Sequence, residues 1–148
     1  MGFYLLENEN PNASLRENGK KGYYYPRRSR DIQGIVVHTA EGGREALGIA
    51  KYLAKTDRTA SAHVVVDDKN IVNLLPDDFT AFHVRGHNSN TLGIELAYFA
   101  SEWGLDKEYE DAVIALAAKW CSEKVELYNI TPRRLNREEW LAGKSGFI

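Results

Sequence analysis

Four histidines and one glutamate are the residues of this chain whose types and spacing could do chemistry. His38 closes a β-branched run, His63 and His83 fall in later short runs, and His87 follows in a loop. Glu95 lies inside an apolar run, where a carboxylate costs free energy unless it is paired or used. Imidazoles and a carboxylate on neighbouring strands suggest metal-assisted hydrolysis, in which a zinc-bound hydroxide attacks and the carboxylate takes and returns its proton.

Each of these residues also has a structural interpretation. A histidine at a strand end is more often a buried group satisfied by a backbone carbonyl than a ligand. Glu95 could equally be an edge-strand residue whose carboxylate points at water. The sequence contains no GxSxG elbow, P-loop, HExxH helix or CxxC pair, so the enzyme classes built on those motifs have no support.

The elements that must position these residues predict an α/β fold. Five short apolar or β-branched runs are expected to be strands, at residues 32–38, 61–66, 71–75, 81–84 and 92–96. Helices are expected at 44–55 and at 107–127, the second capped by Asp106, and Asn136 could cap a short last helix. A polar turn between the second and third strands predicts a hairpin. The whole pattern predicts one domain with a mixed central β-sheet flanked by helices.

Composition limits the classes of partner. The 148 residues include 19 Lys+Arg, 21 Asp+Glu and one cysteine, Cys121, and the net charge is -2. This balance argues against a nucleic-acid protein that depends on a strong positive field. No apolar stretch reaches the roughly 18 residues needed to cross a bilayer, and the start lacks the apolar segment of a signal peptide. We expect no nucleic acid, no membrane span and synthesis in the cytoplasm.

The polar, turn-rich residues 1–30 predict an irregular N-terminal arm ahead of a domain that covers 31–148. Within the arm, the aromatic and basic run 23–28 favours a solvated basic turn over a contact with an anionic polymer. No repeat, low-complexity tract or linker divides the remainder of the chain.

Three motifs in order resemble the type 2 N-acetylmuramoyl-L-alanine amidases, a zinc-dependent family that includes phage endolysins, bacterial cell-wall recycling amidases and peptidoglycan recognition proteins. The motifs are Ile35-Val-Val-His38-Thr-Ala, Ser61-Ala-His63-Val-Val-Val-Asp, and Ala81-Phe-His83 with Asn90-Thr-Leu-Gly93-Ile-Glu95-Leu. The resemblance covers about residues 32–135 and implies a mixed sheet flanked by helices. It also implies hydrolysis of the amide between the lactyl group of N-acetylmuramic acid and L-alanine, with peptidoglycan or a muropeptide as partner.

The resemblance assigns the zinc chemistry to two residues. His38 matches the family's first zinc ligand. Glu95 matches the glutamate that many members use beside the zinc to handle the proton of water. Other members place a tyrosine on the second strand, where this chain has Ala62, so Glu95 is the expected catalytic residue.

Three further residues are expected to bind substrate. His63 and His83 match histidines that line the family's cleft, where they would orient substrate or neighbouring groups, with a structural role as the alternative. Asn90 matches a loop asparagine that helps shape the groove, and a plain turn residue is its alternative. Phe82 takes the place of an aromatic near the groove floor, where a core role is favoured over a substrate contact.

The expected second zinc ligand lies beyond this sequence. In the family a Gly-His motif follows the long helix and a variable segment, and an Asp or Cys supplies the third ligand. No histidine follows His87, and the sequence stops at Ile148, where that motif would come next. Because a stable zinc site needs three or four protein ligands, we expect a C-terminally incomplete domain with doubtful zinc occupancy. The 148-residue form would then be a weak or inactive amidase that acts on the cell wall once released. The alternative is a non-catalytic peptidoglycan-binding or prophage regulatory module, and the oligomeric state stays open.

Overall fold

The computed structural model describes residues 2–5, 24–25, 27–55 and 60–148, of which 2–5 are described by their backbone alone. The strands are β1 (Gly2–Leu5), β2 (Tyr24–Tyr25), β3 (Gly34–Thr39), β4 (Val64–Val66), β5 (Asn70–Asn73), β6 (Thr80–Ala81), β7 (Thr91–Leu96) and β8 (Gly146–Phe147). The α-helices are α2 (Ala46–Lys55), α3 (Lys107–Tyr128) and α4 (Arg137–Leu141), and short 3-10 turns lie at Asn88–Asn90 and Ala100–Glu102.

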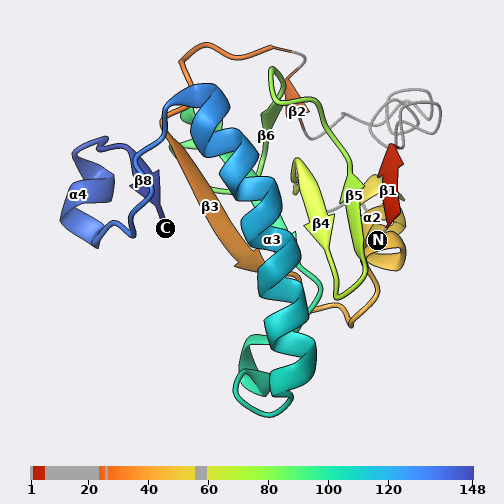
Figure 1. Cartoon of the computed structure of the whole chain (residues 1–148). Coiled ribbons are helices and arrows are strands. Elements are labelled where there is room, and N and C mark those ends of the chain that lie inside the picture. The colour runs from red at the N-terminus through yellow and green to blue at the C-terminus, as the bar shows by residue number, and fades with distance from the viewer. Residues whose placement is uncertain (1, 6–23, 26, 56–59) are drawn as a thin grey trace.

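Six strands form one mixed sheet in the order β1-β5-β4-β7-β3-β8, with β1 and β8 at its two edges (Figure 1). The central strand β7 is parallel to both β3 and β4, whereas β4 and β5 form the predicted antiparallel hairpin. The prediction of an α/β domain with a mixed central sheet is therefore confirmed. The register of β3 and β7 sets His38 beside Glu95.

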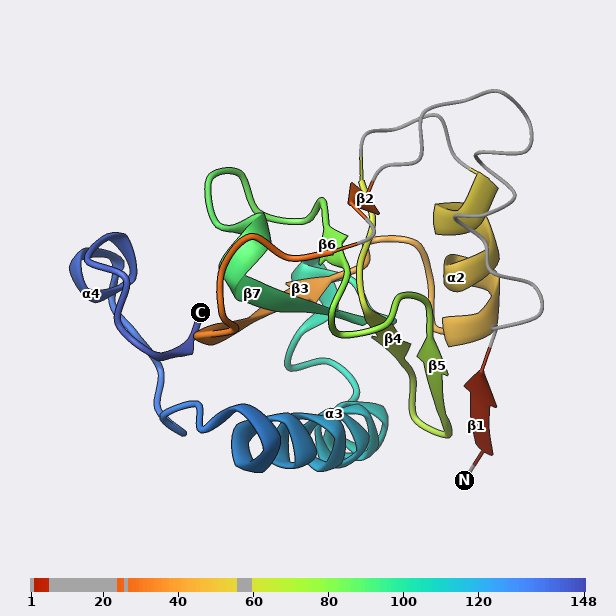
Figure 2. The same cartoon turned by 90° about the horizontal axis from the view of Figure 1, so that it is seen from above.

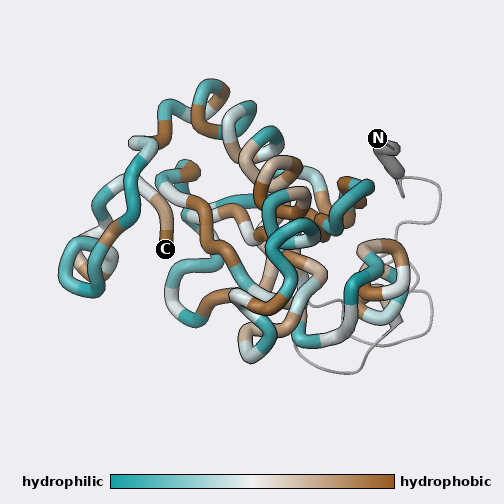
Figure 3. The backbone as a smooth tube through the Cα atoms, turned by 60° about the horizontal axis from the view of Figure 1, so that its bottom comes forward, coloured by the Kyte–Doolittle hydropathy of each residue, from teal (hydrophilic) through white to brown (hydrophobic). Residues whose placement is uncertain are grey.

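The two main helices cover opposite faces of the sheet, as the view from above shows (Figure 2). On the α3 face, alternate residues of β3, β4 and β7 such as Ile35, Val64 and Ile94 are fully buried and pack in one apolar cluster with Leu116 and Trp120 of the helix. On the other face, Val65 and Val72 pack with α2. Figure 3 shows apolar residues concentrated along the inner strands, while α3 alternates between polar and apolar turns.

Local signals in the sequence set both ends of α3 and the start of α4. The Asp106 side chain accepts a hydrogen bond from the Tyr109 amide at 3.2 Å, and Asn129 caps the C-terminus of α3 in the left-handed conformation, with φ 51°. Asn136 and Glu139 form a reciprocal capping box on α4. The predicted caps at Asp106 and Asn136 are confirmed, and Cys121 is buried on α3.

The structure differs from the predicted irregular arm in two places. Gly2–Leu5 form a strand parallel to β5, and Tyr24–Tyr25 pair antiparallel with β6. Residues 6–23 of the predicted arm lie outside the described part. The predicted strand 81–84 is also shorter, because the Asn88 side chain accepts hydrogen bonds from the amides of His83 and Val84 and turns the chain away from the sheet. Within the described ranges, no helix is long and apolar enough to cross a membrane.

Candidate functional site

Two adjoining cavities meet at Glu95, on the sheet face that carries α2. The first has a volume of about 540 Å³ and is lined by His38, Thr39, Ala40, Glu41, Gly42, Gly48, Ile49, Tyr52, Leu53, Ala60 and Glu95. The second has a volume of about 400 Å³ and is lined by Leu53, Ala60, Ser61, Phe82, His83, Val84, Arg85, Asn88 and Glu95. Because the two share Leu53, Ala60 and Glu95, we treat them as one cleft, termed the Glu95 groove.

His38 and Glu95 stand side by side at the carboxyl ends of β3 and β7, where parallel strands commonly deliver functional groups. Glu95 is half-buried, and that burial raises the pKa of its carboxyl group to about 7. No hydrogen bond or ion pair to this carboxylate is found in the part of the chain that the structure describes. Burial also lowers the pKa of His38. The site therefore holds a carboxyl group that can exchange a proton near neutral pH, next to a neutral imidazole.

His83 lies against His38 on the groove floor. Its Nδ1 is 3.1 Å from Nε2 of His38, and its Nε2 is 3.0 Å from the Thr91 hydroxyl oxygen. The ring rests on Gly93, where an added Cβ would come within 2.7 Å of ring atoms. Burial, followed by the nearby imidazoles and the Arg28 cation, lowers the pKa of His83 to about 2. His83 is therefore a neutral, clamped imidazole.

His63 lies beneath the groove and not on its wall, since only 1% of its surface is exposed. Its Nδ1 accepts a hydrogen bond from the Gly93 amide at 2.9 Å, so the proton of the neutral ring sits on Nε2, which donates to the Phe79 carbonyl at 3.0 Å. Burial, followed by the Arg28 charge, lowers the pKa of His63 to about 4. Both nitrogens are used internally, so this structure gives His63 no atom with which to contact a substrate.

Arg28 is a site component that the sequence pattern misassigned. The solvated basic turn predicted for the run 23–28 is wrong at this residue, because its guanidinium is half-buried beside His63. Arg28 lines two other cavities and not the Glu95 groove itself. It donates hydrogen bonds to the carbonyls of Asp77, Thr91 (2.9 Å) and Ser89 (3.3 Å) and lies beside His63. Burial lowers the pKa of Arg28 to about 10. Arg28 thus fastens the loop between β5 and β7 to the segment before β3, and no local sequence signal shows this.

Asn88, and not Asn90, lines the groove in this structure. Asn90 is buried and absent from the groove lining, and its side-chain amide donates to Gln33 at 3.3 Å. Asn88 lines the groove instead and holds the turn after His83. Phe82 lines the second cavity and makes an edge contact with Tyr25, with ring centroids 5.0 Å apart. Asn88 is the residue that sequence reasoning missed, although a loop asparagine two positions earlier was an available signal.

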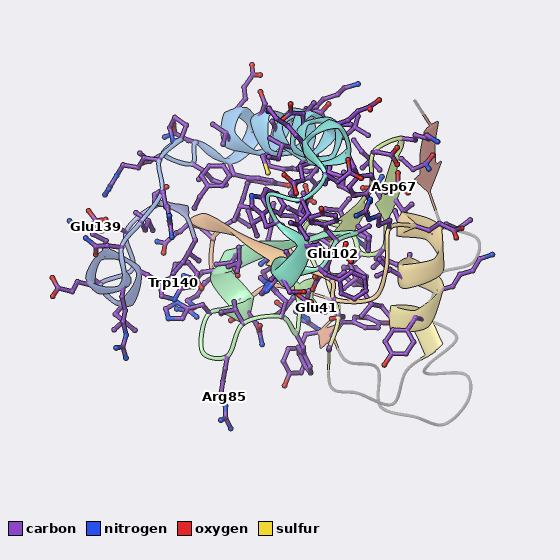
Figure 4. The ribbon with its side chains drawn as sticks, turned by 90° about the horizontal axis from the view of Figure 1, so that it is seen from below. Glu41, Asp67, Arg85, Glu102, Glu139 and Trp140 are labelled. Atoms are coloured by element: carbon purple, nitrogen blue, oxygen red, sulfur yellow. The ribbon has the colours of Figure 1, made fainter. Side chains whose placement is uncertain are left out.

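Two charged residues mark the edges of the groove. Arg85 extends outward from the loop after β6, and Glu41 lies at the first cavity (Figure 4). The Glu41 carboxylate is already engaged, since one of its oxygens accepts hydrogen bonds from the Thr39 hydroxyl and the Ala100 amide. Behind the loop, the ring of Trp140 on α4 lies 4.4 Å from the ring of His87. His87 is therefore a packing residue on the α4 side of the loop.

The described residues do not fit a complete zinc site. None of their histidine, cysteine, aspartate and glutamate side chains come together in a group of three or more that could hold a metal ion. His38 faces the groove, but His83 forms a hydrogen bond with His38. Both ring nitrogens of His63 are bonded to the backbone of Phe79 and Gly93. Three protein ligands are the usual minimum for a zinc site, so His38 stands as a single candidate ligand.

Known proteins resemble this chain in sequence profile and in fold. Residues 28–145 match the sequence profile of a family described as N-acetylmuramoyl-L-alanine amidase. A search of curated proteins found no match. The fold is similar to that of PlyL, with a TM-score of 0.65 and 20% identity over 88% of this chain and 76% of that chain.

Two further solved structures are similar in the same way. The Staphylococcus aureus hydrolase AmiA, solved with its ligand, has a TM-score of 0.66 and 18% identity over 93% of this chain and 70% of that chain. A mutant endolysin from Bacillus subtilis has a TM-score of 0.57 and 25% identity over 81% of this chain and 80% of that chain. The family profile spans most of the sequence and includes every residue of the Glu95 groove, so this protein belongs to the N-acetylmuramoyl-L-alanine amidase family.

Proposed function

We propose that the Glu95 groove binds the N-acetylmuramoyl-L-alanine part of peptidoglycan and that Glu95 handles the proton in cleavage of its amide. The observation that carries this proposal is the pairing of His38 with Glu95 at the groove floor, within a chain that matches the amidase family. A carboxyl group with a pKa of about 7 suits the task, because it can take a proton from water and return it to the leaving amine near neutral pH.

The zinc expected of this family enters the proposal through His38 alone. Because the described residues offer no group of three ligands, we propose that the 148-residue polypeptide holds zinc weakly and binds cell walls better than it cleaves them. A peptidoglycan-binding module without catalysis is the second candidate function, and the same observation favours it.

The test combines three measurements on the purified chain. We expect less than one zinc per chain by metal analysis, binding to purified cell walls, and slow release of stem peptides that disappears in Glu95→Ala. Stoichiometric zinc with fast, Glu95-dependent release would overturn the weak-site proposal. Failure of the folded protein to bind walls would overturn the groove proposal, whereas binding without any release would establish the non-catalytic module.

The direction of β8 supplies a second test of the metal proposal. β8 runs parallel to β3, and the Val37 amide donates to the Ile148 carbonyl at 2.8 Å. Continued by two residues, this register would reach the position opposite His38. We expect that appending Gly-His after Ile148 raises zinc affinity roughly tenfold or more, because a second imidazole would reach the groove. Appended Gly-Ala is the matched control, and equal affinity in the two extended chains would contradict the proposed place of the site.

A further inference from the structure

We infer that Thr91 and His83 form a directed hydrogen-bond chain that holds His38 in one tautomer, with its proton on Nε2 and its Nδ1 lone pair free. The inference rests on the proposed function only in giving His38 a ligand role. The tautomer itself can be measured without metal or substrate.

The hydrogen-bond chain begins at Thr91, which is fully buried. Its hydroxyl donates to the His87 carbonyl at 2.7 Å, and a carbonyl can only accept. The single hydroxyl proton is used in that bond, so the oxygen acts as acceptor toward Nε2 of His83, 3.0 Å away. Nε2 of His83 therefore carries the ring proton.

The same reasoning passes through the His83 ring to His38. A neutral imidazole has one N–H, so Nδ1 of His83 is a bare acceptor. It faces Nε2 of His38 at 3.1 Å, and a hydrogen bond at that distance requires the proton to sit on His38 Nε2. Nδ1 of His38 is then left with a lone pair, and no hydrogen bond to it is found among residues 27–55 and 60–148.

The His83 ring is held so that this chain keeps its direction. Gly93 leaves room for the ring only because it has no Cβ, and the backbone amide of His83 is fixed by the Asn88 side chain at 3.0 Å. Thr91, Gly93 and Glu95 alternate along β7 and so share the groove face of the strand. Strand β7 therefore supplies three parts of the site: the Thr91 hydroxyl at the end of the hydrogen-bond chain, Gly93 against the His83 ring, and the Glu95 carboxyl group.

This arrangement has a clear chemical use. A histidine that ligates a metal usually donates its other ring N–H to an acceptor, which fixes the ring's orientation and increases its basicity. Here the acceptor is a second imidazole, itself oriented by a buried hydroxyl. Thr91 and His83 are thus positioning residues that act through His38 and present its Nδ1 to an electrophile in the groove.

The test is ring-nitrogen NMR of the metal-free chain labelled with ¹⁵N-histidine, at pH 7.5. We expect His38 and His83 both to show a protonated Nε2 and a bare Nδ1. In Thr91→Val, which keeps the shape of the side chain and removes the hydroxyl, the His38 nitrogen shifts should move toward the average of two tautomers. Thr91→Ser should restore the native pattern, because it keeps the hydroxyl.

A matched control is Thr80→Val, since Thr80 is also buried and its hydroxyl also donates to a backbone carbonyl, that of Arg27 at 2.8 Å. It should leave the His38 shifts unchanged. Unchanged His38 shifts in folded Thr91→Val would overturn the inference. If that variant does not fold, the native spectrum alone decides, because a protonated Nδ1 on His38 contradicts the proposed direction and a bare Nδ1 supports it. Neither result alters the wall-binding test, so the two proposals fail separately.

Discussion

Replacing Glu95 by glutamine is expected to raise the unfolding free energy by about 3 kcal/mol at pH 8 and to change it little at pH 5. The cause is the half-buried carboxyl group, whose pKa rises from 4.5 to about 7 in the folded protein. Between these two values the folded state keeps a proton that the unfolded state has lost, so the native chain loses stability as the pH rises from 4.5 to 7. Glutamine has the same shape and no charge to desolvate, and it removes this loss.

The same substitution is expected to lower the rate of catalysis sharply. A glutamine cannot accept the proton of water, and loss of a general base commonly lowers a rate by about 10²- to 10⁴-fold. A gain in stability joined to a loss of activity is the pattern of a group held in an unfavourable state for its function. This pattern distinguishes a catalytic carboxylate from a structural one, because neutralising a structural carboxylate would destabilise the protein.

Urea denaturation of the native chain and Glu95→Gln at pH 5 and pH 8, with stem-peptide release measured at pH 8, checks this prediction. Glu123→Gln on the exposed face of α3 is the control and should change stability by no more than about 0.5 kcal/mol at either pH. If Glu95→Gln destabilises the protein at pH 8, the carboxylate has a favourable partner in solution and the proposed role is wrong.

The residues that sequence patterns place correctly are those controlled by their neighbours in the chain. Alternation along 92–96 sends Ile94 into the core and Glu95 to the other face, and the side chains of Asp106 and Asn136 cap helices that begin right after them. These are local effects of strand period and of unpaired helix amides.

The residues whose surroundings the sequence patterns do not reveal are controlled by contacts between distant segments. Arg28 donates hydrogen bonds to backbone carbonyls of the loop that follows β5 and of the first residue of β7, 49 to 63 positions away. His63 can be buried without an unpaired nitrogen because the Gly93 amide and the Phe79 carbonyl satisfy its ring. The sequence neighbours of His63 do not show whether its side chain lines the groove or lies beneath the groove floor. Histidines of both kinds stand in short apolar runs. Register decides between them, and register depends on the whole sheet.

Acidification is expected to destabilise the protein through His83 on the groove floor and His63 beneath it. The pKa of His63 falls to about 4 and that of His83 to about 2 in the folded state, from an ordinary value of 6.5. Below pH 6.5 these two histidines bind protons in the unfolded chain but stay neutral in the folded chain, so the free energy of unfolding falls as the pH falls. From pH 7 to pH 5 the loss is about 2 kcal/mol for each histidine.

Glu95 acts in the opposite direction over the same range, because its folded form takes up a proton between pH 7 and pH 5 and thereby regains about 2 kcal/mol. The native chain should therefore lose only about 2 kcal/mol on going from pH 7 to pH 5, whereas Glu95→Gln should lose about 4 kcal/mol. Urea denaturation at pH 7, 6 and 5 measures both losses.

Histidine NMR on the folded chain is the independent check, since His63 and His83 should keep their neutral shifts at pH 5. A titration of either ring near pH 6 would show that water or an anion reaches the cluster, and the groove floor would then be open where this structure has it closed.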